Sequence, residues 1–343
     1  MSLKAPAAMC PTDFAVNLSE VTKTFSQWQR DSTGRGLLRN LIKPEKRTIT
    51  ALKNVSFSLG RGEFVAYAGP NGAGKSTTMK LLSGMLLPDS GTVSVLGLSP
   101  QRQRVGLMNR LGILFGNRTE LWWDHPVIQS YAWKKVVWGI PDDLYRQNLA
   151  MVTELLDLRG LLKTFARELS LGQRMRADLG MLLLHSPEVI LLDEPTLGLD
   201  VSAKRQMIDF LRELNRLRGV TILVTSHDMD DLEEMARRIL LISAGELAFD
   251  GSFQELRAMT GSPTRLTVTA MRGPAPHLQC ADLISAENGV FEYGVDLVKS
   301  PVTELLRQLS ETEGVRDVEL RKAPIEQVIA GLYQQWRESP APR

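Results

Sequence analysis

The chain has 343 residues, of which 43% are hydrophobic, and a formal net charge of +2. This length predicts two domains, or one large domain with an appendage, and the apolar content is ordinary for a packed globular protein. A charge so close to zero argues against a nucleic-acid-binding role based on charge alone. The two cysteines, Cys10 and Cys280, lie far apart and lack metal-site spacing, which is typical of a reduced cytosolic protein with incidental thiols.

No targeting signal or membrane-spanning segment is expected. The N-terminus lacks the apolar region of a secretion signal. The most apolar stretch, from Leu179 to Leu192, is interrupted by polar residues and a proline, and it falls short of the ~18 apolar residues that span a bilayer. We therefore expect a protein in the cytosol or on the cytosolic face of a membrane.

The pattern of apolar residues predicts an α/β fold. Residues 1–13 are expected to form a loose tail, and Phe14 to Val21 alternates like a strand until the pattern breaks at Ser26. Several short runs rich in β-branched residues suit buried strands, and a helical stripe lies between them (strands at 51–59, 63–68, 189–192 and 220–224; helix at 140–162). After a composition shift near residue 261, a small α+β appendage is expected (strands at 265–271 and 315–321, helices at 302–313 and 325–337).

A phosphate-binding loop is predicted between the strand at 63–68 and a following helix. The stretch from Gly69 to Thr77 satisfies G-x-x-x-x-G-K-[ST]. Its glycines allow backbone N–H groups to converge on phosphate oxygens, and the helix N-terminus favours negative charge. Lys75 suits the β- and γ-phosphates, and the Ser76 hydroxyl suits Mg²⁺. The candidate nucleotide-binding residues are Gly69, Asn71, Gly72, Ala73, Gly74, Lys75, Ser76 and Thr77.

Two further strand ends carry candidate catalytic residues. The strand at 189–192 runs into Asp193, which suits Mg²⁺, and Glu194, which suits a general base that polarises water. The alternative is a solvated acidic turn. The strand at 220–224 is followed by His227, which could donate a hydrogen bond to the γ-phosphate or simply be a surface or capping residue. With Lys75, these residues predict a nucleoside triphosphatase.

The five residues from Leu169 to Gln173 (LSLGQ) resemble the signature loop of the ABC ATPases, usually Leu-Ser-Gly-Gly-Gln. The phosphate loop, the stretches 193–196 and 197–200, and His227 stand with it in the order expected of that family. The resemblance therefore covers roughly residues 14–250. It implies a P-loop NTPase cassette at 14–260, with a RecA-like core, an antiparallel β subdomain and a helical subdomain at about 115–170, followed by the accessory domain 261–343. The stretch 114–128 is similar to a subgroup of uncharacterised export ATPases.

The resemblance also implies roles for individual residues. Phe25 matches the aromatic that stacks on adenine, although a core phenylalanine is the alternative. Ser170, Gly172 and Gln173 match the signature loop, which reaches the ATP of a second subunit across a two-fold axis. Asp200 matches an interface aspartate, with a surface loop acid as the alternative.

Two positions depart from the family pattern. Leu171 replaces the first glycine of the signature loop, where we expect a modest effect. Asn117 stands where the family has a glutamine that reaches Mg²⁺ or the attacking water. Because asparagine is one methylene shorter, either a bridging water compensates or coupling is altered. Since Glu194 and His227 are both present, hydrolysis is expected to survive.

The family implies an ATP- and Mg²⁺-dependent subunit on the cytoplasmic face of the cell membrane, with two protein partners: a second ATPase subunit and a separate transmembrane permease for export. The tryptophan-rich region from Leu121 to Trp138 is either a permease contact or the core of the helical subdomain. The basic insertion 26–50 is either a solvated loop or an amphipathic segment against the permease or lipid headgroups.

Two other functions remain open. The first is a soluble ABC ATPase acting on nucleic acid or ribosomes. A single phosphate loop and a short interval from Lys75 to Asp193 argue against it, so no nucleic-acid partner is expected. The second is a weakly hydrolysing regulatory cassette, suggested by Asn117.

Overall fold

The computed structural model describes most of the chain, and the chain divides into two compact units. The described residues are 14–28, 46–115, 118–259, 264–270, 275–278, 281–287, 289–295, 302–312, 314–321 and 325–338. The units are Met1–Asp250 and Gly251–Arg343. This division comes ten residues before the expected boundary at residue 260. Among the described residues, no helix combines the length and apolar character needed to cross a bilayer.

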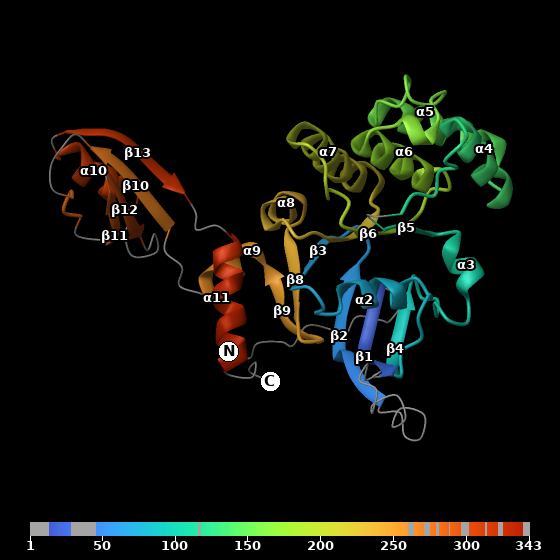
Figure 1. Cartoon of the computed structure of the whole chain (residues 1–343), viewed down its shortest axis with the longest axis horizontal. Coiled ribbons are helices and arrows are strands. Elements are labelled where there is room, and N and C mark those ends of the chain that lie inside the picture. The colour runs from blue at the N-terminus through green and yellow to red at the C-terminus, as the bar shows by residue number, and fades with distance from the viewer. Residues whose placement is uncertain are drawn as a thin grey trace, which may run out of the picture. The chain divides into compact units, whose positions relative to one another are not determined.

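A six-stranded sheet forms the centre of the first unit (Figure 1). Its strand order is β5-β6-β7-β3-β8-β9, and the first five strands are parallel. The strands β6 and β7 are buried along almost their whole length, which explains their continuous apolar sequences. The bounds are β3 (Phe64–Ala68), β5 (Leu111–Phe115), β6 (Val189–Asp193), β7 (Thr221–Thr225), β8 (Arg238–Ser243) and β9 (Glu246–Ser252). The predicted α/β fold is confirmed.

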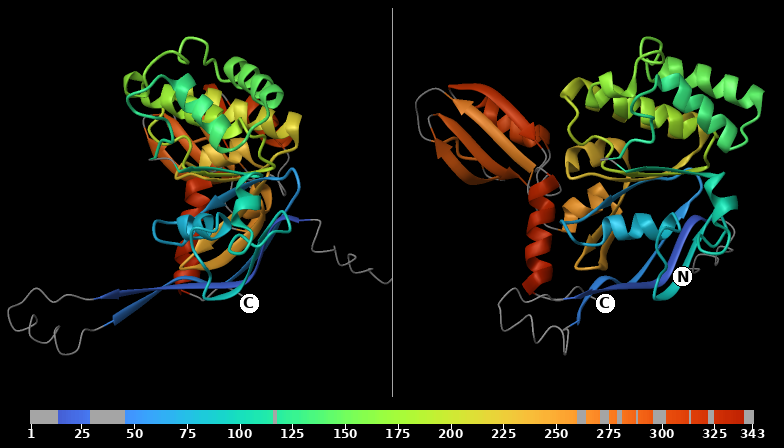
Figure 2. Two further views of the ribbon diagram at one scale, coloured as in Figure 1. Left: turned by 90° about the vertical axis from the view of Figure 1, so that its right-hand side faces the viewer. Right: turned by 45° about the vertical axis from the view of Figure 1, so that its right-hand side comes forward.

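An antiparallel sheet of order β2-β1-β4 lies beside this core. Figure 2 shows β1 (Phe14–Trp28) and β2 (Lys46–Gly60) as a long two-stranded ribbon, and β4 is Ser90–Val95. The expectation that the strand pattern ends before Ser26 is wrong. Register shifts between Phe14 and Thr24 disrupt the alternation of buried and exposed residues, although the ladder continues to Trp28. Residues 29–45 of the predicted insertion lie outside the described residues.

Three helices form a subdomain at one end of the sheet (Figure 1). They are α4 (Val127–Val137), α5 (Asp142–Leu155) and α6 (Leu171–Leu183), and α6 packs against both of the others. Proline precedes α4 and α5, and two aspartates in the first turn of α5 favour its N-terminus. The remaining helices of the cassette are α2 (Lys75–Leu82), α3 (Arg104–Met108), α7 (Val201–Arg218) and α8 (Met229–Met235).

The second unit contains an antiparallel sheet of order β11-β12-β10-β13. Leu305 and Leu309 of α10 pack on its apolar residues Leu266, Val268 and Phe291. The strands β11 and β12 were not predicted, because β11 is largely exposed and lacks a clear apolar alternation. The helix expected to reach Glu313 ends at Ser310. The bounds are α9 (Phe253–Met259), β10 (Thr264–Ala270), β11 (Ala281–Glu287), β12 (Val290–Val295), α10 (Val302–Ser310), β13 (Val315–Arg321) and α11 (Ile325–Glu338).

Candidate nucleotide-binding site

The loop from Gly69 to Gly74 joins β3 to α2 with little space to spare. A Cβ on Gly69 would collide with the backbone oxygen of Ile242. Gly74 caps α2 with φ 116°, and a Cβ there would lie 2.6 Å from the backbone oxygen of Ala51. Only glycine adopts this backbone at such close approach without strain. The loop therefore has the close-packed backbone that its sequence predicts, in which N–H groups at the start of a helix are available to bind phosphate.

Lys75 is buried and points back into this loop. Its Nζ donates to the backbone oxygens of Gly69 at 2.6 Å and Pro70 at 3.3 Å. Burial lowers the pKa of Lys75, and the nearby carboxylates of Glu194 and Asp193 act in the opposite direction. The lysine thus lies as a positive charge between the loop and the acidic end of β6.

Asp193 links the loop to two neighbouring strands. Its Oδ2 accepts from the Ser76 hydroxyl at 3.1 Å, and its Oδ1 accepts from the Thr225 hydroxyl at 2.6 Å. A hydroxyl and a carboxylate at this distance form the kind of oxygen donor set that Mg²⁺ prefers. The role of Thr225 was missed, although it is the last residue of β7.

Glu194 and His227 approach each other beyond the ends of β6 and β7. The Oε1 atom of Glu194 lies 2.6 Å from Nε2 of His227. The backbone N–H of Glu194 donates to the backbone oxygen and the hydroxyl of Thr225, both at 3.1 Å. Glu194 has φ 59°, a conformation that costs a residue with a side chain about 1–3 kcal/mol. Backbone strain of this kind persists only where the surrounding structure holds the residue in place, and it is common at functional sites.

The signature-like residues gather where α6 and α7 begin. Ser170 caps α6 and forms a reciprocal capping box with Gln173, at 3.3 Å and 2.9 Å. Asp200 caps α7 by accepting from the N–H of Ala203 at 2.9 Å. A Cβ on Gly172 would lie 3.3 Å from the Cβ of Ala203, so the two helix starts are closely packed.

The neighbouring apolar side chains are left uncovered. Leu171, Leu197 and Val201 are all exposed, although they are apolar and cluster around these helix starts. Scattered exposed leucines are ordinary, but three in one place are typical of an interaction surface.

Phe25 is not a core residue. It lies opposite Ile49 in the β1–β2 ladder and is 38% exposed, with Lys23 Nζ 5.7 Å from its ring. The same ladder reaches Ala51, whose backbone oxygen lies against Gly74 of the phosphate loop. An exposed aromatic ring on this ribbon is available to a planar ligand. The predicted site residue Asn117 lies outside the described residues.

The tryptophan-rich region divides into a core part and a surface part. Tyr131 is fully buried, and its hydroxyl donates to the backbone oxygen of Ala177 at 2.6 Å, so this residue belongs to the core of the helical subdomain. Trp122, Trp123 and Trp133 are each between 38% and 49% exposed. The Trp122 ring lies 5.3 Å from that of Trp133, and Arg174 lies over Trp123 at 5.4 Å. We call Trp122, Trp123 and Trp133 the aromatic surface.

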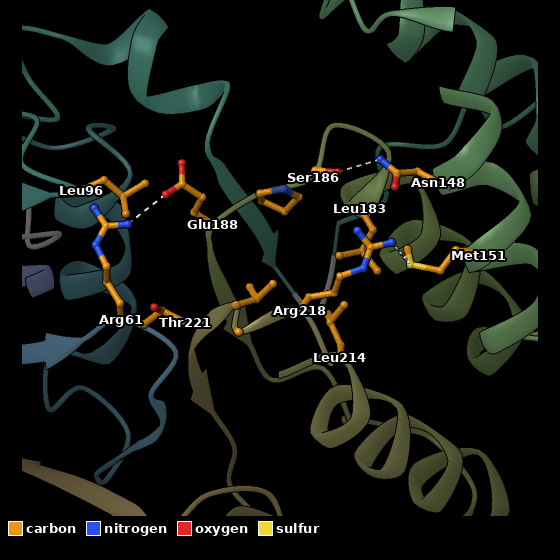
Figure 3. Close-up of a pocket in the computed structure, with 13 residues that line it drawn as sticks. Arg61, Leu96, Asn148, Met151, Leu183, Ser186, Glu188, Leu214, Arg218 and Thr221 are labelled. Atoms are coloured by element: carbon orange, nitrogen blue, oxygen red, sulfur yellow. Dashed lines mark hydrogen bonds and ion pairs between the residues drawn. The ribbon is translucent and has the colours of Figure 1, made fainter. Parts of the chain in front are cut away.

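A separate cavity of about 310 Å³ lies at the amino-terminal ends of the parallel strands β6 and β7 (Figure 3). It is lined by residues at the beginnings of β6 and β7, including Glu188 and Thr221, and by Asn148 of α5. The phosphate loop follows the carboxyl end of β3, which is parallel to β7, so the loop and the cavity lie at opposite ends of the strands. Among the residues that the structure describes, no predicted site residue lines this cavity, so it is distinct from the candidate nucleotide site.

Comparison with known proteins agrees with this arrangement. Residues 52–197 match the family model described as ABC transporter. The chain is 33% identical to a putative ABC transporter ATP-binding protein of Methanosarcina mazei, over 72% of this chain and 51% of that protein, so it spans about half of that relative's length. It is 31% identical to the linearmycin resistance ATP-binding protein LnrL of Bacillus subtilis, over 64% of this chain and 70% of that protein.

A solved structure shows the same fold. The ATP-binding cassette MJ0796, a dimer bound to ADP and Pi, superposes with a TM-score of 0.58 at 23% identity, over 69% of this chain and 98% of that one. The first unit therefore has the architecture of an ATP-binding cassette, and the chain belongs to the ABC transporter ATP-binding family.

Proposed function

We propose that this chain hydrolyses ATP as the nucleotide-binding subunit of an ABC transporter and drives export through a separate permease. The proposal is carried by one observation: Lys75 and Asp193 contact the phosphate loop and its serine, and Glu194, whose charge acts on Lys75, lies beside His227. A glycine-rich loop alone serves many nucleotide-binding proteins. Hydrolysis requires in addition a carboxylate near Mg²⁺ and a group that accepts a proton from water. Asp193, which is hydrogen-bonded to Ser76, suits the first role, and Glu194 beside His227 suits the second.

Each residue has a distinct role in this proposal. The loop N–H groups and Lys75 bind the phosphates, and Phe25 stacks on the adenine. Ser76 and Asp193 hold Mg²⁺, with Asn117 as a further expected ligand. Bound Mg²⁺ neutralises charge on the phosphate oxygens. Glu194 accepts a proton from the attacking water while His227 donates a hydrogen bond to the γ-phosphate, so their close approach sets the place of attack.

The proposed active form is a head-to-tail dimer of two copies. Ser170, Gly172 and Gln173 of one copy complete the site around the ATP held by the other, and Asp200 lies at the interface. The exposed apolar residues Leu171, Leu197 and Val201 support this, since a second copy would cover them. The cassette MJ0796, which has the same fold, is a dimer.

The aromatic surface is the proposed permease contact. Half-exposed tryptophans anchor protein interfaces well, because a large apolar area is buried with little loss of side-chain entropy. Val136 and Val137, one turn after Trp133 on α4, are exposed as well, which enlarges the apolar area. The subunit would thereby be held at the cytoplasmic face of the cell membrane.

The decisive experiment measures phosphate release by the purified full chain with ATP, with and without Mg²⁺. We expect hydrolysis that requires Mg²⁺ and that Glu194→Gln abolishes. Purification from membranes together with the product of a neighbouring permease gene tests the transport role. Hydrolysis without any membrane association would favour a soluble ATPase, and ATP binding without hydrolysis would favour a regulatory cassette.

A further inference from the structure

One buried acidic residue, Asp178, lies outside the candidate nucleotide site. It is on α6, the helix that Ser170 caps, and is only 6% exposed. Its Oδ1 accepts from the Thr119 hydroxyl at 2.8 Å and from the backbone N–H of Glu120 at 3.1 Å. The Thr119 hydroxyl in turn accepts from the N–H of Leu121 at 3.1 Å. One carboxylate therefore holds the segment 118–121, which follows Asn117 in the chain, against α6.

The surroundings make this carboxylate costly to keep. Burial raises the pKa of Asp178 to about 6, against the hydrogen bonds from Thr119 and Glu120. The charged and titratable groups that face it are Glu120 of the segment, Arg174 of α6, and Lys134 and Tyr131 of α4. Lys134 is buried as well, with Nζ 3.5 Å from Glu120 Oε2. Replacing a buried charged group by well-packed apolar residues is often neutral or stabilising, so stability alone does not account for this carboxylate.

The segment and the helix that Asp178 joins lead to two parts of the proposed ATP site. The segment follows β5, which ends at Phe115 and pairs with the Asp193 strand, and Asn117 precedes the segment in the sequence. The N-terminus of α6 carries Ser170 and Gly172. A rigid link between the segment and α6 fixes their relative position, and therefore how the residues of two copies meet in a dimeric site. Small displacements of such residues are expensive for catalysis.

We propose that Asp178 is a positioning residue for ATP hydrolysis, which locks the segment 118–121 to α6 through its bonds to Thr119 and Glu120. It touches neither ATP nor metal and acts through the parts that it joins. The inference rests on the proposed ATPase function. Ionised Asp178 forms the stronger link, because hydrogen bonds to a charged acceptor are roughly twice as strong as neutral ones.

The first test compares steady-state ATP hydrolysis by the full chain with Asp178→Ala, Thr119→Val and the double variant. We expect kcat to fall roughly tenfold or more in Asp178→Ala, with KM for ATP changed by less than about twofold, because the phosphate loop is untouched. The double variant should be no slower than Asp178→Ala, since both remove the same link. Asp143→Asn, at an exposed carboxylate in the same subdomain, is the control and should match wild type.

A second test uses Asp178→Asn, which keeps the shape and one acceptor but not the charge. The ratio of wild-type to variant kcat should be largest near about pH 8 and approach one near about pH 5, where wild-type Asp178 is itself protonated. Features of the pH profile that do not involve Asp178 cancel in this ratio. A merely structural role would give a ratio that does not follow the protonation of Asp178.

The outcomes separate the two proposals. Absence of hydrolysis by the wild-type chain would reject the ATPase function itself. Wild-type hydrolysis with an unchanged kcat in Asp178→Ala, or with independent, multiplying losses in the double variant, would overturn the positioning role. If Asp178→Ala fails to fold, the pH-dependence of the Asp178→Asn ratio decides: a constant ratio rejects the inference.

Discussion

Glu194 and His227 lie 2.6 Å apart, between Oε1 and Nε2, although they follow different strands of the sheet. Thr225 brings them together, because its backbone oxygen and its hydroxyl both accept from the Glu194 N–H. Glu194 also has a positive φ of 59°, which few residues with a side chain adopt. Backbone contacts thus position this pair.

Glu194→Gln is expected to abolish turnover while ATP binding persists. Glutamine keeps the shape but cannot accept the proton from water, and loss of a general base costs roughly a hundredfold or more. Phosphate release measures the first effect, and binding of a fluorescent ATP analogue measures the second. Glu154→Gln, at an exposed position of α5, is the matched control. Retained hydrolysis in Glu194→Gln would assign the proton acceptor to another group.

Asp178→Asn is expected to stabilise the protein in a pH-dependent manner. The pKa of Asp178 is raised to about 6 in the folded chain from 3.8, so the unfolded chain loses this proton first as the pH rises. The contribution of Asp178 to the free energy of unfolding is therefore greatest below about pH 4 and is lost as the pH rises through 6. The loss is up to about 3 kcal/mol.

Denaturant unfolding at about pH 4.5 and about pH 8 checks this prediction. The gain of Asp178→Asn over wild type should be larger at the higher pH. An equal gain at both pH values would show that burial does not raise this pKa. A variant that is more stable but slower would fit a residue retained for function.

A local pattern predicted the nucleotide loop, whereas contacts between distant segments could not be predicted. The phosphate loop depends on residues within one strand–loop–helix unit, and Ser170 and Gln173 form their capping box within one turn. The Thr119–Asp178 bond joins residues separated by 59 positions, and no local signal specifies it. An acid in the apolar sequence of α6 was the only available sign.

Exposure was also difficult to predict in the helical subdomain. Tyr131 and Trp133 lie on the same helix and are both aromatic, yet Tyr131 is buried and Trp133 is not. The packing of α4 against α6 decides between them, and that packing depends on the whole subdomain. The β1–β2 ladder illustrates a similar limit. Its register shifts interrupt the alternation of apolar residues, so the sequence does not reveal that the strand continues to Trp28.

Two helical glycines should respond to alanine in opposite directions. At Gly180 of α6, a Cβ would collide with the Tyr131 hydroxyl and lie 2.9 Å from Leu158 Cδ1. Because both neighbours are buried, Gly180→Ala should destabilise the chain by about 1–3 kcal/mol. At Gly106 of α3, a Cβ meets open space, so Gly106→Ala should stabilise by up to about 1 kcal/mol through the helix preference of alanine. Thermal unfolding of both variants measures the contrast, and equal shifts would contradict it.

Replacing Trp122 and Trp123 by alanine should weaken binding to the permease without unfolding the subunit. Both side chains are substantially exposed, so their loss removes little from the core, whereas loss of a central interface tryptophan commonly costs about 2 kcal/mol or more of binding. Co-purification with the permease measures the first effect, and thermal unfolding of the isolated chain measures the second. Leu87→Ala, at an apolar position of comparable exposure outside the helical subdomain, controls for general loss of surface hydrophobicity. Unchanged co-purification of the double variant would remove the aromatic surface from the interface, and the permease would then have to dock elsewhere on the cassette.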